Sequence, residues 1–132
     1  GLQYQTDQVL VSCGGKHSLF NLCQAMLDSG DEVIIPAPYW VSYPDIVLLA
    51  DATPVIVDCP MANGFKLQPE QLREAINANT RMVILNSPSN PTGVAYSRAE
   101  LEALGEVLRE HPEILVVSDD IYEHILWTDE PF

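Results

Sequence analysis

Short runs of apolar residues alternate along the chain with segments in which apolar residues recur every three or four positions. The short runs predict buried strands, and the recurring pattern predicts amphipathic helices. Strands are expected at residues 9–11, 32–35, 55–57, 82–85 and 114–117, with helices at 19–27, 43–50, 69–76 and 98–108 between them. Strand and helix therefore alternate along nearly the whole chain.

The boundaries of these segments carry residues that start and stop helices. Ser29 and Gly30 end the first helix, and Pro69 stands at the start of the third. Ser97 and Glu100 form a capping box before the fourth. Near-continuous apolar strands separated by amphipathic helices are typical of a parallel sheet covered on both faces. The sequence therefore predicts one domain of the α/β class, with three layers, α/β/α, and a mostly parallel sheet.

The segments that follow the strands are the candidates for a functional site. In a parallel α/β sheet, ligands bind in the crevice beyond the carboxyl ends of the strands. The segments that reach this crevice are predicted to be Gly14–Lys16, Pro38–Trp40, Asn86–Gly93 and Asp119–Tyr122.

The segment Gly14-Gly15-Lys16 connects a predicted strand to a predicted helix. Backbone N–H groups and the positive end of the helix dipole would point into the crevice there, so a phosphate could bind. A tight turn without a ligand is the more common explanation of the two glycines. A P-loop is excluded, because His17 follows Lys16 and no glycine stands at the required spacing upstream.

The segment Asn86–Gly93 has two X-Pro bonds and a final glycine directly after a buried strand. Such a stiff loop could hold the side chain of Asn90 toward the crevice, although a purely structural turn is the alternative. Trp40 follows the 32–35 strand and could lie flat against a planar ring. By itself, a tryptophan in the core is the more common case.

Two aspartates, Asp119 and Asp120, follow the last predicted strand. They are similar to the magnesium-binding acids of NTPases, but that interpretation lacks its P-loop. Asp119 could instead face a nitrogen atom of a ring-shaped ligand, with Tyr122 approaching the ligand from one side. A capping or solvated role is the more common one for such a pair.

Charge and cysteine content narrow the classes of function. A net charge of −13 with only six Lys and Arg would repel a phosphate backbone, which argues against nucleic-acid binding. The longest aliphatic stretch, Ile46–Ala50, is much shorter than the roughly 20 residues of a membrane span. Cys13, Cys23 and Cys59 have neither zinc-ligand spacing nor a disulfide framework, so no metal site is expected and a reducing cytoplasm is favoured.

Four segments, each directly after a predicted strand, are more informative together than alone. In order they are GGKHSLFNL, PAPYWVSYP, NSPSNPTG and SDDIYEH. Their combination resembles the class I aminotransferases, in particular the bacterial aspartate aminotransferases, over nearly the whole chain. The resemblance implies the fold of the pyridoxal-phosphate-dependent transferases. Residues 1–132 would form part of the large cofactor-binding domain, without its C-terminal part and without the small domain.

The resemblance also implies pyridoxal 5′-phosphate (PLP) as the cofactor. The backbone amides of Gly15 and Lys16 would bind its phosphate, and Trp40 would stack on its ring. Asn90 would hydrogen-bond the ring hydroxyl and, like Trp40, lie near the substrate.

Two further contacts with the ring follow from the same resemblance. Tyr122 would donate a hydrogen bond to the ring oxygen that Asn90 also contacts. Asp119 would pair with the ring nitrogen, and an ionised aspartate there keeps that nitrogen protonated, so that the ring can accept electrons.

The catalytic residue of the family is a lysine that forms a Schiff base with the cofactor. Its expected place lies beyond Phe132, and Lys16 and Lys66 stand in the wrong motifs to replace it. The full-length parent is expected to be a homodimer that transfers the amino group of an amino acid, with aspartate favoured, to a 2-oxo acid by ping-pong chemistry. The chain alone is expected to be inactive.

Two other functions are compatible with the same residues. One is a PLP-dependent lyase or synthase, because these residues hold the cofactor and do not select the reaction. The other is the sensor domain of a transcription regulator, which would need a DNA-binding domain upstream.

The resemblance gives two structural expectations as well. The Asn90–Pro91 and Ala37–Pro38 peptide bonds are expected to be cis. The strand at Val9–Ser12 is expected to lack its neighbours in the sheet, because the family inserts beside it strands that are missing here, and its N–H and C=O groups would then be unpaired.

Overall fold

The computed structural model describes residues 2–127. Within them lie four strands, β1 (Glu32–Ala37), β2 (Thr53–Asp58), β3 (Thr80–Asn86) and β4 (Leu115–Asp119). The helices are α1 (Gly15–Met26), α2 (Ser42–Leu49), α3 (Pro69–Ala75) and α4 (Arg98–Arg109), with short 3-10 turns η1 (Thr6–Gln8) and η2 (Met61–Asn63). All four predicted helices and four of the five predicted strands are therefore present.

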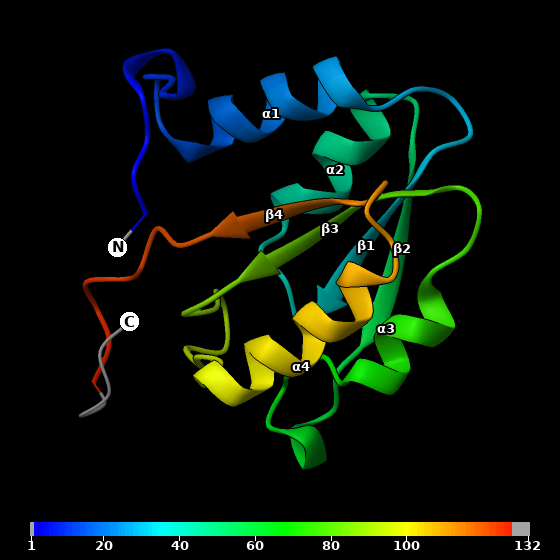
Figure 1. Ribbon diagram of the computed structural model, residues 1–132, viewed down its shortest axis with the longest axis vertical. Helices are drawn as coiled ribbons and strands as arrows, with labels where there is room; N and C mark the ends of the chain where they lie inside the picture. The colour runs from blue at the N-terminus through cyan, green and yellow to red at the C-terminus, as the bar shows by residue number, and fades with distance from the viewer. Residues whose placement is uncertain (1, 128–132) are drawn as a thin grey trace.

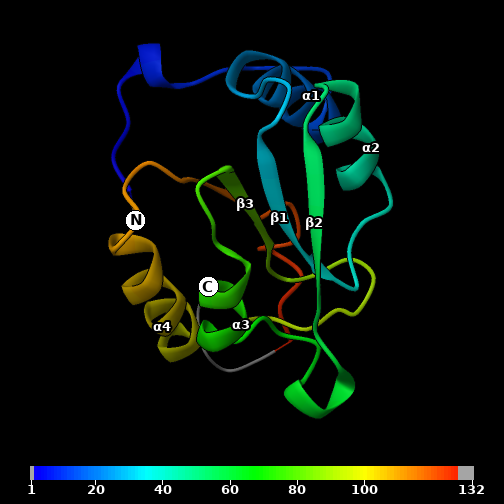
Figure 2. The same ribbon diagram turned by 90° about the vertical axis from the view of Figure 1, so that its right-hand side faces the viewer.

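The strands form one parallel sheet in the order β2-β1-β3-β4. Ile34 of β1 lies opposite Val55 on one side and Val83 on the other, so apolar residues line up across the sheet. Helices α1 and α2 cover one face, and α3 and α4 cover the other (Figures 1 and 2). The predicted three-layer α/β/α architecture is confirmed.

Alternate residues of the central strands pack into two separate cores. Val33 and Ile35 are fully buried on the face covered by α1 and α2, where Val47 of α2 packs with them. Ile34 points the other way and packs with Leu104 of α4. Burial on both faces explains why these strands are apolar at every position rather than at every second one.

The predicted strand at residues 9–11 is wrong. This segment has no strand structure and lies outside the sheet, and Val9, Leu10 and Val11 are 61%, 74% and 91% exposed. Its apolar pattern is that of a buried strand, but no strand within residues 2–127 pairs with it. The expectation that this segment lacks its neighbours is confirmed.

The local signals of the sequence are found where they were predicted. Pro69 is the first residue of α3. The Ser97 side chain accepts a hydrogen bond from the Glu100 backbone, and the Glu100 side chain accepts one from the Ser97 backbone, which completes the capping box of α4. The Ala37–Pro38 and Asn90–Pro91 bonds are cis, as expected, and so is Ser87–Pro88.

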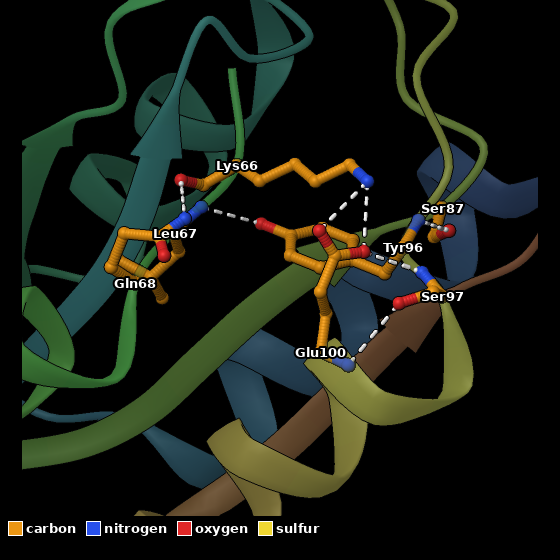
Figure 3. A network of polar contacts seen from close by, with 7 residues as sticks. All are labelled: Lys66, Leu67, Gln68, Ser87, Tyr96, Ser97 and Glu100. Atoms are coloured by element: carbon orange, nitrogen blue, oxygen red, sulfur yellow. Dashed lines mark hydrogen bonds and ion pairs between the residues drawn. The ribbon is translucent and has the colours of Figure 1, made fainter. Parts of the chain in front are cut away.

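A polar network joins the segment after η2 to the start of α4 (Figure 3). The ammonium of Lys66 lies 3.0 and 2.8 Å from the two carboxylate oxygens of Glu100. The Tyr96 hydroxyl accepts a hydrogen bond from the Leu67 N–H at 2.8 Å, and the Tyr96 N–H donates to the Ser87 hydroxyl at 3.1 Å. The loop between β3 and α4 is thus held at both ends.

Two groups of this network have shifted pKa values. Burial by itself would raise the pKa of Glu100, but the hydrogen bonds from Lys66 and Ser97 outweigh it and hold that pKa below its ordinary value. Burial raises the pKa of Tyr96 to about 12, although the Leu67 N–H acts in the opposite direction.

Candidate functional site

A cavity of about 130 Å³ lies at the carboxyl edge of the sheet, where ligands bind in folds of this class. Side chains or backbone from four separate segments line it. The lining residues are Gly15, Lys16, Trp40, Tyr43, Asn86, Asn90, Asp119, Ile121 and Tyr122. All six of the residues predicted from the sequence are therefore brought together at one cavity.

The parallel topology is what gathers these residues. Gly15 begins α1, and Trp40 lies in the connection from β1 to α2. Asn90 belongs to the loop after β3, while Asp119 is the last residue of β4 and Tyr122 follows it. Because the strands run parallel, the connections that follow their carboxyl ends meet at the same edge.

The amino end of α1 forms one wall of the cavity. Gly14 caps the helix with a φ of 87°, a conformation that glycine adopts without strain. The N–H groups of His17 and Ser18 donate to the Gly14 carbonyl. Gly15 and Lys16 occupy the first two helical positions, whose N–H groups have no acceptor inside a helix, so both are available to a ligand.

Trp40 and Lys16 lie next to each other at this wall. The Lys16 ammonium is 4.9 Å from the centre of the Trp40 ring, and Tyr43 packs edge-on against the same ring at 5.5 Å between centroids. The chain has six lysine and arginine residues, and five of them form ion pairs with carboxylates. Within residues 2–127, Lys16 is the one without such a partner, so the cavity contains a cation that is free to pair with an anion.

The carboxylate of Asp119 accepts a hydrogen bond from the buried side chain of Tyr43. The Tyr43 hydroxyl donates to Asp119 Oδ2 at 2.6 Å, and the tyrosine is only 3% exposed. Burial raises the pKa of Tyr43 well above its ordinary value, and the hydrogen bond to Asp119 raises it further. The phenol therefore stays protonated at neutral pH and keeps its bond to the carboxylate.

Asn90 lies in a loop with internal hydrogen bonds. The Gly93 N–H donates to the Ser89 carbonyl at 2.8 Å, and the Ser89 N–H donates to the Val94 carbonyl at 2.9 Å. The Asn90 N–H donates to the Asn86 side chain at 2.8 Å. The predicted stiffness of this segment therefore rests on hydrogen bonds as well as on its prolines.

Three lining residues were not singled out by the sequence-based prediction, although two of them, Asn86 and Ile121, lie in segments that were predicted to reach the crevice. Tyr43 is one helical turn after Trp40, but its contact with Asp119 joins positions 76 residues apart. Asn86 is a polar residue at the end of a buried apolar strand, which is a signal that could have identified it. Ile121 is an exposed apolar residue in an otherwise polar segment, and no sequence signal separates it from its neighbours.

Residues 2–127 contain neither a cluster of metal ligands nor a helix of membrane-spanning length. No group of three or more His, Cys, Asp or Glu residues there is arranged to hold a metal ion. Among the helices of residues 2–127, none is long and apolar enough to cross a bilayer.

Curated relatives of this chain carry aminotransferase names. The aspartate/prephenate aminotransferase of Cereibacter sphaeroides is 60% identical over 100% of this chain and 33% of its own length. The enzyme of the same name from Nitrosomonas europaea is 56% identical over 99% of this chain and 33% of its own length. The chain thus spans about a third of the length of these relatives.

Solved structures agree with the sequence relatives. The crystal structure of an aspartate aminotransferase from Rhizobium meliloti matches with a TM-score of 0.97 at 50% identity, covering 99% of this chain and 33% of that one. The Thermus thermophilus aspartate aminotransferase with maleate matches with a TM-score of 0.85 at 50% identity, over 90% and 31% of the two chains. The fold is that of the aspartate aminotransferases. The family model described as aminotransferase class I and II matches residues 1–132, and the chain belongs to that family.

Proposed function

We propose that the cavity at the carboxyl edge binds PLP, and that a full-length protein containing this chain transfers an amino group from aspartate to a 2-oxo acid. The chain spans about a third of its relatives, so this activity belongs to the whole protein. The observation that carries the proposal is the set of groups around one cavity: a carboxylate, an amide, a phenol, an indole and a helix amino end.

The residues fit the parts of this cofactor one by one. The Asp119 carboxylate would hold the protonated ring nitrogen, and Asn90 and Tyr122 would hydrogen-bond the ring oxygen. When bound, PLP supplies a ring that accepts electrons from the α-carbon of the amino acid. Asp119 contributes by keeping the ring nitrogen protonated, which Tyr43 supports by fixing the carboxylate.

The remaining groups fit the cofactor's face and phosphate. Trp40 offers an aromatic face to the ring. The N–H groups of Gly15 and Lys16 would bind the phosphate at the amino end of α1, and the Lys16 ammonium adds a cation that has no carboxylate partner within residues 2–127. An anionic ligand would neutralise it.

The substrates are inferred from the relatives. Two of them are named for aspartate and prephenate, which supports aspartate as the amino donor and prephenate as one 2-oxo acid acceptor. The named activities also favour an aminotransferase over a PLP-dependent lyase or a sensor domain. We further infer that residues 1–132 are part of the large cofactor-binding domain and that the full-length protein forms a homodimer. A cytoplasmic location is supported by the free thiols of Cys13, Cys23 and Cys59.

The proposal is tested by replacing Asp119 in a full-length protein that contains this chain. Asp119→Asn keeps the size of the side chain and removes the negative charge that would hold the ring nitrogen protonated. We expect kcat for aspartate with 2-oxoglutarate, and with prephenate, to fall by about 100-fold or more, as for loss of a key electrostatic contact.

The matched control is Asp120→Asn. Asp120 adjoins Asp119 but accepts a hydrogen bond from Ser118 and does not line the proposed cofactor cavity. Its replacement should change kcat less than about threefold, as expected for a half-buried position that does not line the proposed cofactor cavity. Equal losses in both variants, or a wild-type protein that neither binds PLP nor turns over aspartate, would refute the proposed function.

A further inference from the structure

Asn86 is the last residue of β3 and uses both ends of its side-chain amide. Its Nδ2 donates to the backbone carbonyl of Asp119 at 2.8 Å. Its Oδ1 accepts from the backbone N–H of Asn90 at 2.8 Å. One half-buried side chain thus connects the end of β4 to the loop after β3, at the wall of the proposed cofactor cavity.

The two connected residues are the ones proposed to hold opposite parts of the cofactor ring. Asp119 belongs to β4 and Asn90 to the loop after β3, and they are 29 positions apart. The β3–β4 ladder pairs Asn86 with Asp119 in register. Beyond the ladder, the Ser87 N–H donates to the Asp119 carbonyl at 3.3 Å, which is a backbone contact to β4 alone. The Asn86 amide is a single side chain that contacts both Asp119 and Asn90.

The residue type matters because the two bonds need opposite polarities. A primary amide carries both a donor and an acceptor on one planar group. Leucine has a similar shape but no polar atom, and serine has one hydroxyl on a shorter stem that cannot span both partners. Tyr43 complements the arrangement, since it binds the carboxylate of Asp119 while Asn86 binds its main chain.

We propose that Asn86 is a positioning residue that fixes the spacing between Asn90 and Asp119, and through it the two polar contacts of the cofactor ring. This inference rests on the proposed function for its ligand. It assigns to Asn86 a role separate from cofactor contact: the amide acts through the two residues that it holds.

The test uses a full-length protein containing this chain and pyridoxamine 5′-phosphate, which has an amine in place of the aldehyde and therefore binds without a covalent bond to lysine. Asn86→Leu should weaken its affinity about tenfold, because both hydrogen bonds of the amide that positions the two ring contacts are lost. In an Asn90→Ala background the same replacement should cost less than about threefold, because residues that act through one another are not additive.

A second measurement does not depend on the cofactor. Backbone hydrogen exchange at Asn90 should become at least about tenfold faster in Asn86→Leu, since the N–H loses its acceptor. Asn86→Ser should give the same change if the leucine variant does not fold. The matched control is Asn77→Leu, because Asn77 also donates and accepts through its side chain, but next to the amino end of β3.

The outcomes separate the two proposals. Unchanged hydrogen exchange at Asn90 would overturn the role of Asn86. So would an Asn86→Leu loss of affinity that is as large in the Asn90→Ala background as in the wild-type protein. Asn77→Leu should leave both the affinity and the exchange at Asn90 unchanged, and equal effects of the two variants would also overturn it. A wild-type protein that does not bind the ligand would refute the proposed function, and the exchange at Asn90 would still decide the positioning role.

Discussion

The contact between Tyr43 and Asp119 shows how a buried residue that lines the cavity can fix another lining side chain. The phenol has little exposed surface, and its hydroxyl is used entirely by the carboxylate. A hydrogen bond to an ionised group is stronger than one between neutral groups. This bond to Oδ2, together with the bond that Oδ1 accepts from the Ile121 N–H at 3.3 Å, restricts the orientation of the Asp119 carboxylate at the cavity.

Replacing this tyrosine by phenylalanine tests the contact. Tyr43→Phe keeps the ring that packs against Trp40 and removes only the donor. In a full-length protein containing this chain, pyridoxamine 5′-phosphate should bind about tenfold more weakly or worse, because a bond to a charged group is lost. Fluorescence titration measures the affinity. Tyr4→Phe, at a 62% exposed tyrosine, is the control, and equal affinities of all three proteins would contradict the prediction.

At the scale of single residues, the sequence identified candidate side chains by their place relative to a strand, and it could not identify side chains whose role depends on a contact with a distant residue. Asp119 ends an apolar strand and Trp40 follows one, which made them candidates, because ligands bind there in parallel sheets. Their expected contacts with the cofactor came from the family resemblance of the motifs around them. Tyr43 and Asn86 could not be assigned their contacts in the same way. Their bonds to Asp119 join positions 76 and 33 residues apart, and only the folded chain brings those positions together.

At the scale of the elements, the start of α4 is stabilised by one glutamate, Glu100, through two separate contacts. Glu100 completes the capping box with Ser97 and pairs with Lys66, whose side chain is 19% exposed. Its pKa is lowered in the folded state, so the stabilisation is fully present above the unfolded value, about 4.5, and is lost as the pH falls through the folded value.

Glu100→Gln should therefore lower the free energy of unfolding of the chain at pH 7 by about 0.5–1 kcal/mol, a modest value because the carboxylate is 40% exposed. The difference from the wild type should shrink as the pH is lowered below 4.5. Urea unfolding at pH 7 and at acidic pH measures both. Glu102→Gln, in the exposed pair with Arg98, should show little change at either pH. A difference that grows toward acidic pH would mean that the sign is wrong.

The elements also show where a hydrophobic pattern is insufficient. The β1 and β3 segments were predicted correctly because both of their faces are buried, and a run of apolar residues reports that burial directly. The segment Val9–Ser12 has the same pattern and is not a strand. A pattern records which residues are suited to burial, whereas a strand also needs neighbours to pair with its backbone. The helices needed no such partner, and all four were found.

For the molecule as a whole, the positions of the two lysines bear on what the chain can do alone. The Lys66 amine is bound by Glu100 and does not line the proposed cofactor cavity. Lys16 lines that cavity at the amino end of α1, where the phosphate would bind, rather than beside the expected aldehyde. In the proposed binding mode, neither amine would be placed to attack the cofactor aldehyde.

The isolated chain should therefore form no specific covalent adduct with PLP and show no transamination. The test mixes the chain with PLP, reduces with borohydride and analyses the product by mass spectrometry. We expect no stoichiometric label at either lysine, with Lys16→Met and Lys66→Met variants as controls for scattered labelling. Stoichiometric labelling of one lysine, or turnover of aspartate with 2-oxoglutarate by the chain, would contradict this.

The carboxyl ends and the amino ends of the strands differ in a way that matters for attaching probes to this protein. Every residue of the proposed cofactor cavity lies at or beyond the carboxyl ends of the strands, or at the start of α1. The turns at Asp28–Asp31 and Asn77–Asn79, which lead into β1 and β3, lie at the opposite edge. Fluorescent dyes, affinity tags or surface tethers are best attached at these turns. A probe placed there would be separated from the proposed cofactor cavity by the full length of the strands.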